Sequence, residues 1–375
     1  MNILVFSWRD LKHPLSGGAE QVMHEHMKGW VAAGHNVTLF SSRSENAAVE
    51  EAIDGIHIVR QGYQYWGVQI AGFFYYLKNR QNFDLIVDQF HGIPFFTPLY
   101  VHKPILAVIQ ETTREVWFLN PLPKPLDWLI GIIGYFGEFL LFPPYKNVQF
   151  MTGSDSAKND VAKFGIPMKN ITVVQHGIII KKPMPFPAKE KKSTIVFLGV
   201  LSKDKGIEEA LKCFAMLSKK GNYQFWVIGR PETNQYGKYI EQMAKNFGLN
   251  KKVTFWGFVN QDKKFELLAK AHILVNPSVR EGWGLVNIEA NSMGTPVVAY
   301  ESRGLVDSVL DGRSGILCKD NKPEKLAAEI CNALTNHKKY LKMQDGAYRW
   351  SKSFSWKKSR GMSLSLLKQI MEKND

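Results

Sequence analysis

Cysteine is scarce in this sequence and follows no recognisable pattern. Cys213, Cys318 and Cys331 are an odd number for 375 residues, and their spacing fits neither a disulfide framework nor a zinc site. This scarcity favours a reducing compartment, and we expect a cytoplasmic protein. The opening residues, MNILVFSWRD, also lack the basic start and apolar run of a secretory signal.

Several functional patterns are absent as well. No run of 18 or more apolar residues is evident, so we expect no membrane-spanning helix. Neither the Gly-x-Gly-x-x-Gly dinucleotide fingerprint nor a P-loop occurs, which argues against an oxidoreductase. The sequence shows no RNA- or DNA-binding motif and no convincing Asp-x-Asp motif at a strand end, so we expect neither a nucleic-acid partner nor a metal.

Length and composition predict two folded domains. A chain of 375 residues, 45% hydrophobic and 12% aromatic, is too long for one ordinary core. The net charge of +14 is uneven, because residues 1–182 carry 16 basic and 15 acidic side chains and residues 183–375 carry 32 and 19. A basic second half suits a nucleic acid, an anionic membrane or a phosphorylated small molecule, and it suits equally a merely well-solvated surface.

Hydrophobic patterning predicts a doubly wound α/β architecture in both halves. Continuous apolar runs, typical of buried parallel strands, alternate with helical patterns. In the first half, we predict strands over 2–7, 35–42, 56–61, 83–90, 104–110, 147–154 and 171–177, and helices over 17–34 and 155–165. In the second half, we predict strands over 193–201, 223–229, 252–259, 272–278, 295–300 and 315–318, and helices over 205–221, 236–247, 263–271 and 285–294.

A change in residue composition and hydrophobic pattern near residue 182 indicates the domain boundary. Residues 181–193 combine three prolines with a cluster of lysines and no apolar period, as expected of a linker. We predict an acceptor-side domain over 1–182, a donor-binding domain over 183–350, and a helix over 351–375 that crosses back to the first domain. Ligands of open parallel sheets bind at the carboxyl ends of strands, so the default site is the cleft between the domains.

Two loops at predicted strand ends have ligand-binding features. Gly17 and Gly18 follow the first strand and open a helix, where the backbone can approach an anion near free N–H groups. A plain loop with a flexible turn is the alternative. The second loop lies in REGWGLVNIE, residues 280–289, where Glu281 is on the turn and Glu289 is on the helix that follows.

The chemistry of this second loop suggests a sugar or ribose. The amides after the turn glycines suit a phosphate, whereas a phosphate would repel the two carboxylates, which therefore suit hydroxyl groups. For Glu289, the alternative is a helix carboxylate that simply lies near Asn291 or Lys270.

These motifs together resemble the retaining glycosyltransferases of family 4. The likeness rests on the pair Glu281-x7-Glu289 with Gly-Trp-Gly-Leu inside it, on Gly17-Gly18, and on the segments VVQHGI and GVLSKDKG, and it covers essentially the whole chain. It implies the GT-B fold, in which two Rossmann-like domains face each other. It also implies a nucleotide diphosphate sugar as donor, UDP- or GDP-linked, with no separate cofactor and no metal.

The resemblance further implies individual roles. Lys205 pairs with the donor diphosphate and Glu281 holds the transferred sugar, as the two catalytic residues, while Glu289 binds the ribose. Without the resemblance, the alternative interpretation of Lys205 is an exposed lysine that precedes a helix. The remaining donor contacts implied by the resemblance are Gly17, Gly18, Gly229, Arg230, Gly257, Val259, Gly282, Trp283, Gly284 and Leu285.

Two positions depart from the family pattern. Many members have an arginine where this chain has Val200, and a histidine, on the acceptor side, where it has Gln110. One guanidinium near the leaving diphosphate is then missing unless Lys203, Arg230 or Arg280 replaces it. Gln110 keeps a hydrogen-bonding side chain but cannot take up a proton.

We therefore predict a hexosyltransferase acting, with retention, on a hydroxyl of a lipid-linked, glycolipid or polysaccharide acceptor. Residues 117–145, rich in Trp, Phe, Leu and Ile, are predicted either to contact the inner face of a membrane or to form a helical hairpin under the first domain. If this segment contacts a membrane, the basic residues available to lipid headgroups are Lys103, Arg114, Lys124 and Lys146. Because of Val200 and Gln110, the alternative is a non-catalytic GT-B protein that binds a nucleotide sugar or a partner.

Overall fold

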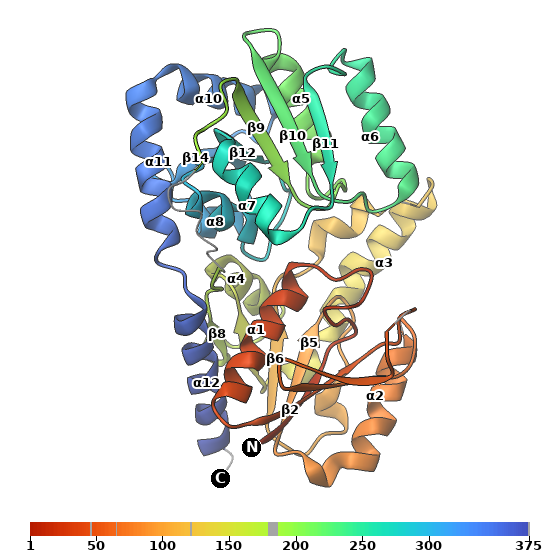
Figure 1. Ribbon diagram of the computed structural model, residues 1–375. Helices are drawn as coiled ribbons and strands as arrows, with labels where there is room; N and C mark the ends of the chain where they lie inside the picture. Colours follow the sequence, from red (N-terminus) through yellow and green to blue (C-terminus); the bar gives the residue numbers. More distant parts are fainter. Residues whose placement is uncertain (46, 65, 121, 179–186, 374–375) are drawn as a thin grey trace. The chain divides into compact units, whose positions relative to one another are not determined.

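The computed structural model describes residues 1–375 except 46, 65, 121, 179–186 and 374–375. The chain forms two compact units (Figure 1): Met1–Gly177 together with Ser355–Asp375, and Ile178–Phe354. The predicted boundary between residues 182 and 183 lies outside the described residues. The C-terminal segment from Ser355 onward belongs to the first unit.

The first unit is built on a sheet with the strand order β3-β4-β2-β1-β5-β6-β7-β8. Neighbouring strands are parallel except β3 and β4, which are antiparallel. The short edge strand β3 was not predicted, because its sequence EEAI lacks an apolar pattern. The strands are β1 (Asn2–Phe6), β2 (Asn36–Ser41), β3 (Glu50–Ile53), β4 (Ile56–Arg60), β5 (Leu85–Phe90), β6 (Ile105–Ile109), β7 (Gln149–Thr152) and β8 (Ile171–Val173).

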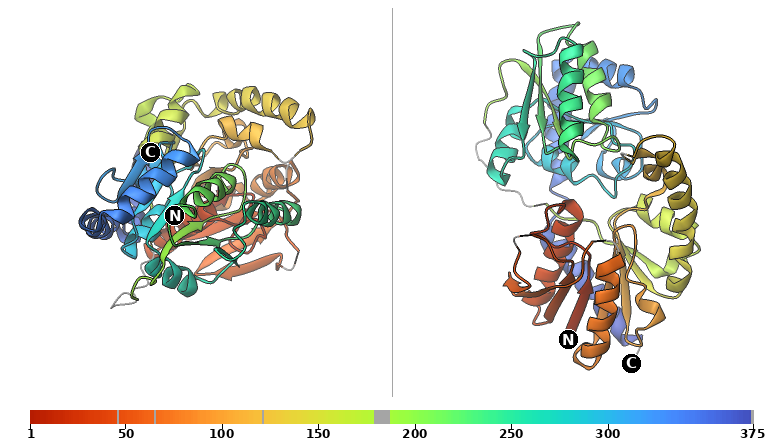
Figure 2. Two further views of the ribbon diagram at one scale, coloured as in Figure 1. Left: turned by 90° about the horizontal axis from the view of Figure 1, so that it is seen from above. Right: turned by 90° about the vertical axis from the view of Figure 1, so that its right-hand side faces the viewer.

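Helices cover both faces of this sheet (Figure 2). They are α1 (Gly18–Ala32), α2 (Trp66–Asn79), α3 (Leu126–Leu141), α4 (Asp155–Lys163) and α12 (Trp356–Glu372), with 3-10 turns η1 (Arg80–Asn82), η2 (Thr97–Leu99), η3 (Arg114–Leu119), η4 (Pro143–Tyr145) and η5 (Met168–Asn170). In β1, Ile3 and Val5 pack with residues of α1 and α12, whereas Leu4 and Phe6 pack with residues of α2. Burial on both faces explains why this strand is apolar at every position after Asn2.

The C-terminal helix α12 is fastened to α1, and Figure 1 shows the two side by side. Ser363 Oγ accepts a hydrogen bond from Trp30 Nε1 at 3.1 Å and lies 3.0 Å from His26 Nδ1. Arg360 on α12 pairs with Glu25 on α1. These contacts are buried or partly buried, so α12 is an integral part of the first unit.

The second unit is built on a wholly parallel sheet with the order β11-β10-β9-β12-β13-β14. Its strands are β9 (Ser193–Leu198), β10 (Tyr223–Ile228), β11 (Val253–Gly257), β12 (Ile273–Asn276), β13 (Val297–Tyr300) and β14 (Gly315–Cys318). Its helices are α5 (Ile207–Leu217), α6 (Asn234–Asn246), α7 (Gln261–Lys270), α8 (Leu285–Ser292), α9 (Leu305–Ser308), α10 (Pro323–Thr335) and α11 (His337–Ser351). Both units therefore confirm the predicted pair of Rossmann-like α/β folds.

Each sheet has one position where the strand order reverses. In the second unit, β9 lies between β10 and β12, and in the first unit β1 lies between β2 and β5. The loops that follow two such neighbouring strands run to opposite sides of the sheet and leave room for a ligand at the carboxyl ends. The loops after β9 and β12, and the loop after β1, are the ones that carry most of the predicted site residues.

The C-terminal region 322–373 forms three helices, α10, α11 and α12. The breaks fall where polar residues cap a new helix. Asn336 Oδ1 accepts from the Lys339 amide at 3.0 Å, and Ser355 Oγ accepts from the Lys358 amide at 3.3 Å. Such N-caps satisfy N–H groups that a continuous helix would bond internally.

The apolar region 117–145 forms η3 and α3, apart from residue 121, which is outside the described residues. We expected no stretch long and apolar enough to span a membrane, and on length and composition alone this expectation was wrong. The window Leu126–Tyr145 is long and apolar enough to cross a membrane, and only 17% of it is buried. In the sequence, Asp127 and Glu138 interrupt the apolar run without making the helix polar.

Candidate active site

Lys205 and Glu281 meet at the carboxyl end of the second sheet. Lys205 lies in the loop between β9 and α5, and Glu281 lies in the loop between β12 and α8. Lys205 Nζ and Glu281 Oε2 are 3.1 Å apart, and the two side chains are 24% and 18% exposed. The reversal of strand order at β9 and β12 thus brings the two predicted catalytic residues into one ion pair that a ligand can reach.

Neighbouring polar groups hold this pair in place. Ser278 Oγ donates to Glu281 Oε1 at 2.9 Å, and the Ser278 amide donates to Asn276 Oδ1 at 3.2 Å. Asp204 Oδ2 lies 3.5 Å from Lys205 Nζ on its other side. Lys205 is therefore flanked by two carboxylates, which fix the ammonium group near the strand ends.

Backbone geometry fixes the loop that carries Glu281. The Glu281 amide donates to the carbonyl of Arg303 at 3.0 Å. Gly304 has a φ of +79°, and a Cβ there would lie 2.0 Å from the Glu281 carbonyl oxygen, so only glycine fits. Helix α8 begins directly after Gly284, whose φ is +88°. The predicted turn and helix are confirmed, and the amides at the start of α8 follow the turn as expected.

The side chain of Trp283 does not point into the site. It is 2% exposed and packs with Ile178, Ile288 and Phe354, with Leu285 partly buried against the same cluster. Its indole lies 4.8 Å from the Phe354 ring, edge to face. The buried side chain of Trp283 therefore fixes the turn to the core of the second unit, and only the backbone atoms of Trp283 can contact a ligand.

Glu289 lies on α8 and pairs with a residue that we did not predict. Lys264 Nζ, from α7, is 2.6 Å from Glu289 Oε1, and both side chains are about one-seventh exposed. The partners considered from the sequence are engaged elsewhere, since Lys270 pairs with Glu266 and Asn291 donates to the Thr295 carbonyl. The sequence does not predict that Lys264 pairs with Glu289, because the two residues lie on different helices. A ribose hydroxyl would share the carboxylate with this lysine.

The glycines at the ends of β9, β10 and β11 lie against one another. The Gly229 amide donates to the Gly257 carbonyl at 2.9 Å. Gly229 has a φ of +141°, and a Cβ there would lie 1.8 Å from the Gly199 carbonyl oxygen. Arg230 and Val259 follow these strand ends, Arg230 exposed and Val259 half-buried. The structure thus brings these four predicted donor contacts to one edge of the second sheet.

In the first unit, Gly17 and Gly18 open α1 as predicted, but a carboxylate already occupies part of this helix terminus. Glu20 Oε2 accepts from the Gly17 amide at 2.6 Å, which is the half of a capping box that the third helical residue supplies. The sequence contains the signal, a glutamate three residues after the N-cap, but we did not use it. An anion bound here would have to use the other amides of the first turn.

Glu20 is itself the centre of a charged cluster at the ends of β1 and β5. Arg9 Nε lies 2.8 Å and His91 Nε2 lies 3.0 Å from Glu20 Oε1. Burial alone would raise the pKa of this carboxyl, but His91 and Arg9 lower it to about 2. Glu20 is therefore ionised, and neither Arg9 nor His91 was identified from the sequence.

Gln110 lies at the end of β6, beside His176. A Cβ at Gly153 would lie 2.3 Å from His176 Nε2 and 3.1 Å from Gln110 Oε1, so this glycine leaves room for the two side chains. Gln110 Oε1 is buried and has no hydrogen-bond partner among the described residues. Burial lowers the pKa of His176 to about 3, so its ring is neutral.

The candidates to replace the missing arginine differ in exposure. Val200 is 40% exposed beyond β9, and Lys203 and Arg230 are exposed, whereas Arg280 is 5% exposed. Lys203 and Arg230 are therefore the cations more open to a ligand. Among the described residues, no group of three or more His, Cys, Asp or Glu side chains could hold a metal ion.

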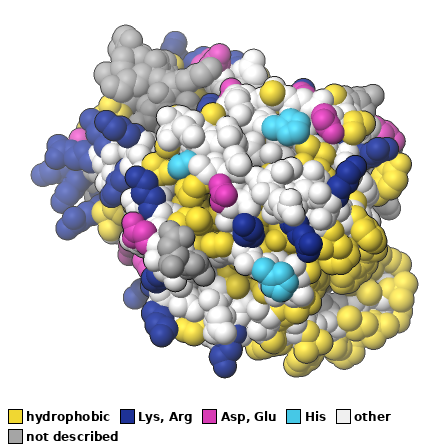
Figure 3. Space-filling view, turned by 90° about the horizontal axis from the view of Figure 1, so that it is seen from below, with side chains coloured by type: hydrophobic (Ala, Val, Ile, Leu, Met, Phe, Trp, Pro, Cys, Tyr) yellow, Lys and Arg dark blue, Asp and Glu magenta, His cyan; other side chains and the backbone are white. Residues whose placement is uncertain are grey.

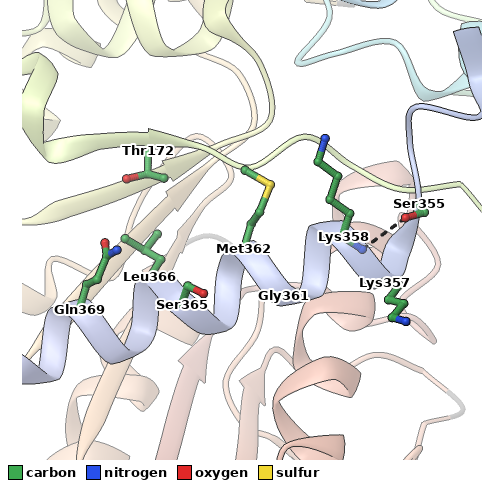
Figure 4. Close-up of a pocket in the computed structure, with 9 residues that line it drawn as sticks. All are labelled: Thr172, Ser355, Lys357, Lys358, Gly361, Met362, Ser365, Leu366 and Gln369. Atoms are coloured by element: carbon green, nitrogen blue, oxygen red, sulfur yellow. Dashed lines mark hydrogen bonds between the residues drawn. The ribbon is translucent and has the colours of Figure 1, made fainter.

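An open groove of about 580 Å³ lies elsewhere, on the first unit between β8 and α12. Figure 4 shows Thr172 facing it from β8, with Lys357, Lys358, Met362 and other residues of α12. None of the predicted site residues lines this groove, and its lining mixes lysines, hydroxyl groups and apolar side chains without a convergent polar set. It is not part of the candidate site.

Two family models match the chain. The model described as Glycosyltransferase Family 4 matches residues 16–182, and the model described as Glycosyl transferases group 1 matches residues 180–350. An uncharacterised glycosyltransferase of Methanocaldococcus jannaschii, MJ1607, is 28% identical over 209 residues, which are 51% of this chain and 52% of that protein. The chain spans about half the length of the curated relatives it matches.

Solved structures share the fold at low identity. Sucrose-phosphate synthase from Thermosynechococcus elongatus has a TM-score of 0.79 at 16% identity, and the match covers 99% of each chain. HepE of Anabaena, solved in complex with UDP-glucose, has a TM-score of 0.73 at 15% identity, over 98% of this chain and 100% of that one. With its two Rossmann-like units, its Glu281 and Glu289 loop and both family models, this chain belongs to the family 4 type of glycosyltransferases with the GT-B fold.

Proposed function

We propose that the protein transfers a hexose from a nucleoside diphosphate sugar to a hydroxyl group, with retention of configuration at the sugar. The observation that carries the proposal is the ion pair between Lys205 and Glu281 at the ends of β9 and β12, directly before the start of α8. A cation, a carboxylate and helix-start amides in one place match a ligand that has a diphosphate beside sugar hydroxyls.

Each group has a distinct part in this reaction. The bond between the anomeric carbon and the diphosphate oxygen breaks, and its electron pair passes to that oxygen, where Lys205 stabilises the charge. The acceptor oxygen bonds to the carbon on the same face, and its proton passes to the leaving phosphate. Glu281 accepts hydrogen bonds from the sugar and Glu289 from the ribose. Removing one preorganised contact of this kind typically costs about 3–4 kcal/mol of transition-state stabilisation.

The first donors to test are UDP-linked sugars. HepE, a structural neighbour, was solved with UDP-glucose, and this supports a nucleotide sugar as the donor class. The roles of Gly17, Gly18 and Gln110 in the first unit stay predictions, as do metal independence and a cytoplasmic location. We propose a lipid-linked or glycan hydroxyl as the acceptor.

A non-catalytic role is the second candidate. Val200 replaces a cation that the family resemblance implies beside the leaving group, and Gln110 replaces a titratable histidine. A protein that has lost both groups could bind a nucleotide sugar without transferring it. Donor hydrolysis, or transfer to any acceptor, excludes this candidate.

The experiment is a thermal-unfolding screen against UDP, GDP, ADP and their common sugar conjugates. A ligand present at 100 times its dissociation constant stabilises the folded state by about 2.7 kcal/mol, enough for a clear shift of the transition. We expect a shift with one nucleotide that Lys205→Ala reduces. The absence of any shift with all three nucleotides would contradict the proposal.

A further inference from the structure

Helix α3 turns its polar side chains inward and its apolar side chains outward. At about 100° per residue, the two charged residues of this helix, Asp127 and Glu138, lie on the same side as Gly131. Glu138 is buried, and its carboxylate accepts hydrogen bonds from the amides of Thr113 at 2.7 Å and Arg114 at 2.9 Å. Glu138 thus fixes α3 to the first unit, whereas the Asp127 carboxylate accepts only from the amide of Trp128 in the same helix.

The outer face of α3 is apolar across more than half of its circumference. Trp128 is 64% exposed, Ile133 58%, Phe136 64% and Leu140 76%. Other exposed residues on this face are Leu126, Leu129, Ile130 and Phe139. The usual surface helix shows the reverse pattern, with charges outward. Figure 3 shows hydrophobic side chains gathered on one side of the face seen from below.

Helix α2 adds a second apolar stripe to the first unit. Trp66, Ile70, Phe74 and Leu77 recur at helical spacing and are between 40% and 63% exposed. Figure 1 shows α2 and α3 on the same side of this unit. Large exposed apolar surface on a folded domain marks an interaction site.

The chemistry of the outer face favours hydrocarbon over a protein partner. Protein interfaces carry about one hydrogen bond per 100–200 Å². On the outer face of α3, the indole N–H of Trp128 is the one side-chain hydrogen-bonding group, since the other residues there are Leu, Ile, Phe and Gly. A surface without donors and acceptors suits the acyl region of a bilayer.

Basic residues border both helices. Exposed Lys124 and Lys146 lie just outside the two ends of the window that contains α3, and exposed Lys78 and Arg80 follow the apolar stripe of α2. Lysine and arginine beside an apolar face attract anionic headgroups, each by about 1 kcal/mol near the surface. The charge pattern is therefore complementary to an anionic lipid surface.

The contacts of α3 argue that it lies on a membrane and does not cross it. The 16 residues of α3 span about 24 Å, less than the hydrocarbon thickness of about 30 Å. The 20-residue stretch Leu126–Tyr145 is longer only because it includes the 3-10 turn η4, where Tyr145 is buried in the first unit. Gly131 and Gly134 receive the rings of Phe118 and Trp117 so closely that a Cβ at either glycine would clash. Crossing the bilayer would expose this packed face and the buried Glu138 to lipid.

We propose that the outer faces of α2 and α3 form a bilayer-binding surface, with α3 lying in the headgroup region parallel to the membrane. Membrane binding in this form does not require the proposed sugar transfer. If both hold, the binding surface presents the first unit to lipid-linked acceptors, and that consequence rests on the proposed function.

The experiment measures binding of the full chain to lipid vesicles by co-sedimentation, without any nucleotide. The vesicles are phosphatidylcholine alone and phosphatidylcholine with one lipid in three replaced by phosphatidylglycerol. We expect binding that is tighter on the anionic vesicles and weakens with salt. Phe136→Glu with Leu140→Glu should raise the half-saturating lipid concentration at least about tenfold per substitution. Leu341→Glu on α11, where the native side chain is 47% exposed, is the matched control and should bind like wild type.

Three results would overturn the proposal. The first is that the wild-type protein binds neither kind of vesicle. The second is that the double variant binds vesicles as well as the wild type does. The third is that the wild type is a dimer in sedimentation velocity, that the double variant is a monomer, and that neither binds vesicles. The third result would identify a second copy of the chain as the occupant. The thermal transition and its nucleotide shift, measured on the same variants, report folding and the proposed function separately.

Discussion

Replacing Lys205 tests the central assignment of the site. The variant Lys205→Met removes the charge and keeps most of the side-chain volume. Lys205 Nζ lies 3.1 Å from Glu281, and at an effective dielectric constant of about 20 two unit charges at this distance attract by about 5 kcal/mol. Because the side chains are 24% and 18% exposed, desolvation and screening cancel most of this, and the net contribution to folding is about 1 kcal/mol or less.

The expected effect on transfer is much larger than the effect on stability. If Lys205 stabilises charge on the leaving diphosphate, its loss should lower kcat by about 10² to 10³, equivalent to roughly 2.7–4 kcal/mol. The assay is initial-rate kinetics with the donor identified by thermal shift, together with urea unfolding of the same preparation. Both kcat and kcat/KM should fall together, since the contact strengthens in the transition state.

A matched control shows whether the effect depends on losing a lysine at this site or on losing any lysine of the second unit. Lys212→Met on α5 removes a lysine that pairs with Glu209 at 2.6 Å, with side chains 41% and 32% exposed, and that is not among the predicted site residues. This control should keep wild-type kinetics. The reasoning is refuted if Lys205→Met retains kcat/KM within about threefold of wild type while remaining folded, or if the two variants lose activity equally.

Three further outcomes follow from the structure. Glu289→Gln should raise the KM for the donor about tenfold or more with a smaller change in kcat, as measured by donor titration, because a ribose contact is made equally before and during reaction. Gly229→Ala should destabilise the second unit by at least about 2 kcal/mol in urea unfolding, because its φ is +141° and the added Cβ would lie 1.8 Å from the Gly199 carbonyl. Burial holds the pKa of His26 and His176 at about 3, below their ordinary 6.5, so the first unit should lose stability as pH falls below 6.5, by up to about 1.4 kcal/mol per pH unit for each histidine. An unfolding temperature that stays level from pH 7 to pH 5 would contradict this last expectation.

The fold was predictable because both sheets are buried on both faces. Strands such as β1 and β12 are apolar at every position except Asn2 and Asn276, one at an end of each strand, and such near-continuous apolar runs are typical of parallel strands between helices. The edge strand β3 was missed because it is half exposed and carries two glutamates. At the C-terminus, α11 and α12 begin at the caps Asn336 and Ser355, and capping is a local signal that periodicity does not register.

The sequence predicted individual residues of the candidate site but not which of them form ion pairs. The residues Lys205 and Glu281 follow different strands, and their contact depends on β9 and β12 being neighbours, which no local pattern encodes. The same holds for Lys264, which reaches Glu289 from another helix. Motif reasoning identifies the residues of a loop, whereas their partners are a property of the sheet order.

The paired state of these residues has a consequence for ligand binding. Lys205 is held by Glu281 and Asp204, and Glu289 is held by Lys264, so the charged side chains of both predicted contacts are already paired with neighbours. A diphosphate that reaches Lys205 competes with carboxylates for the same ammonium group, and it approaches two negative charges while doing so. The cost of that approach falls if Glu281 turns from the lysine to the sugar hydroxyls in the same step, because a neutral hydroxyl then replaces a cation as its partner. Nucleoside diphosphate alone, which has no sugar to engage Glu281, should therefore gain relatively more affinity than the intact sugar donor from the substitution Glu281→Gln. Titration of both ligands against wild type and this variant measures the difference, and an equal change for the two would show that Glu281 does not exchange partners.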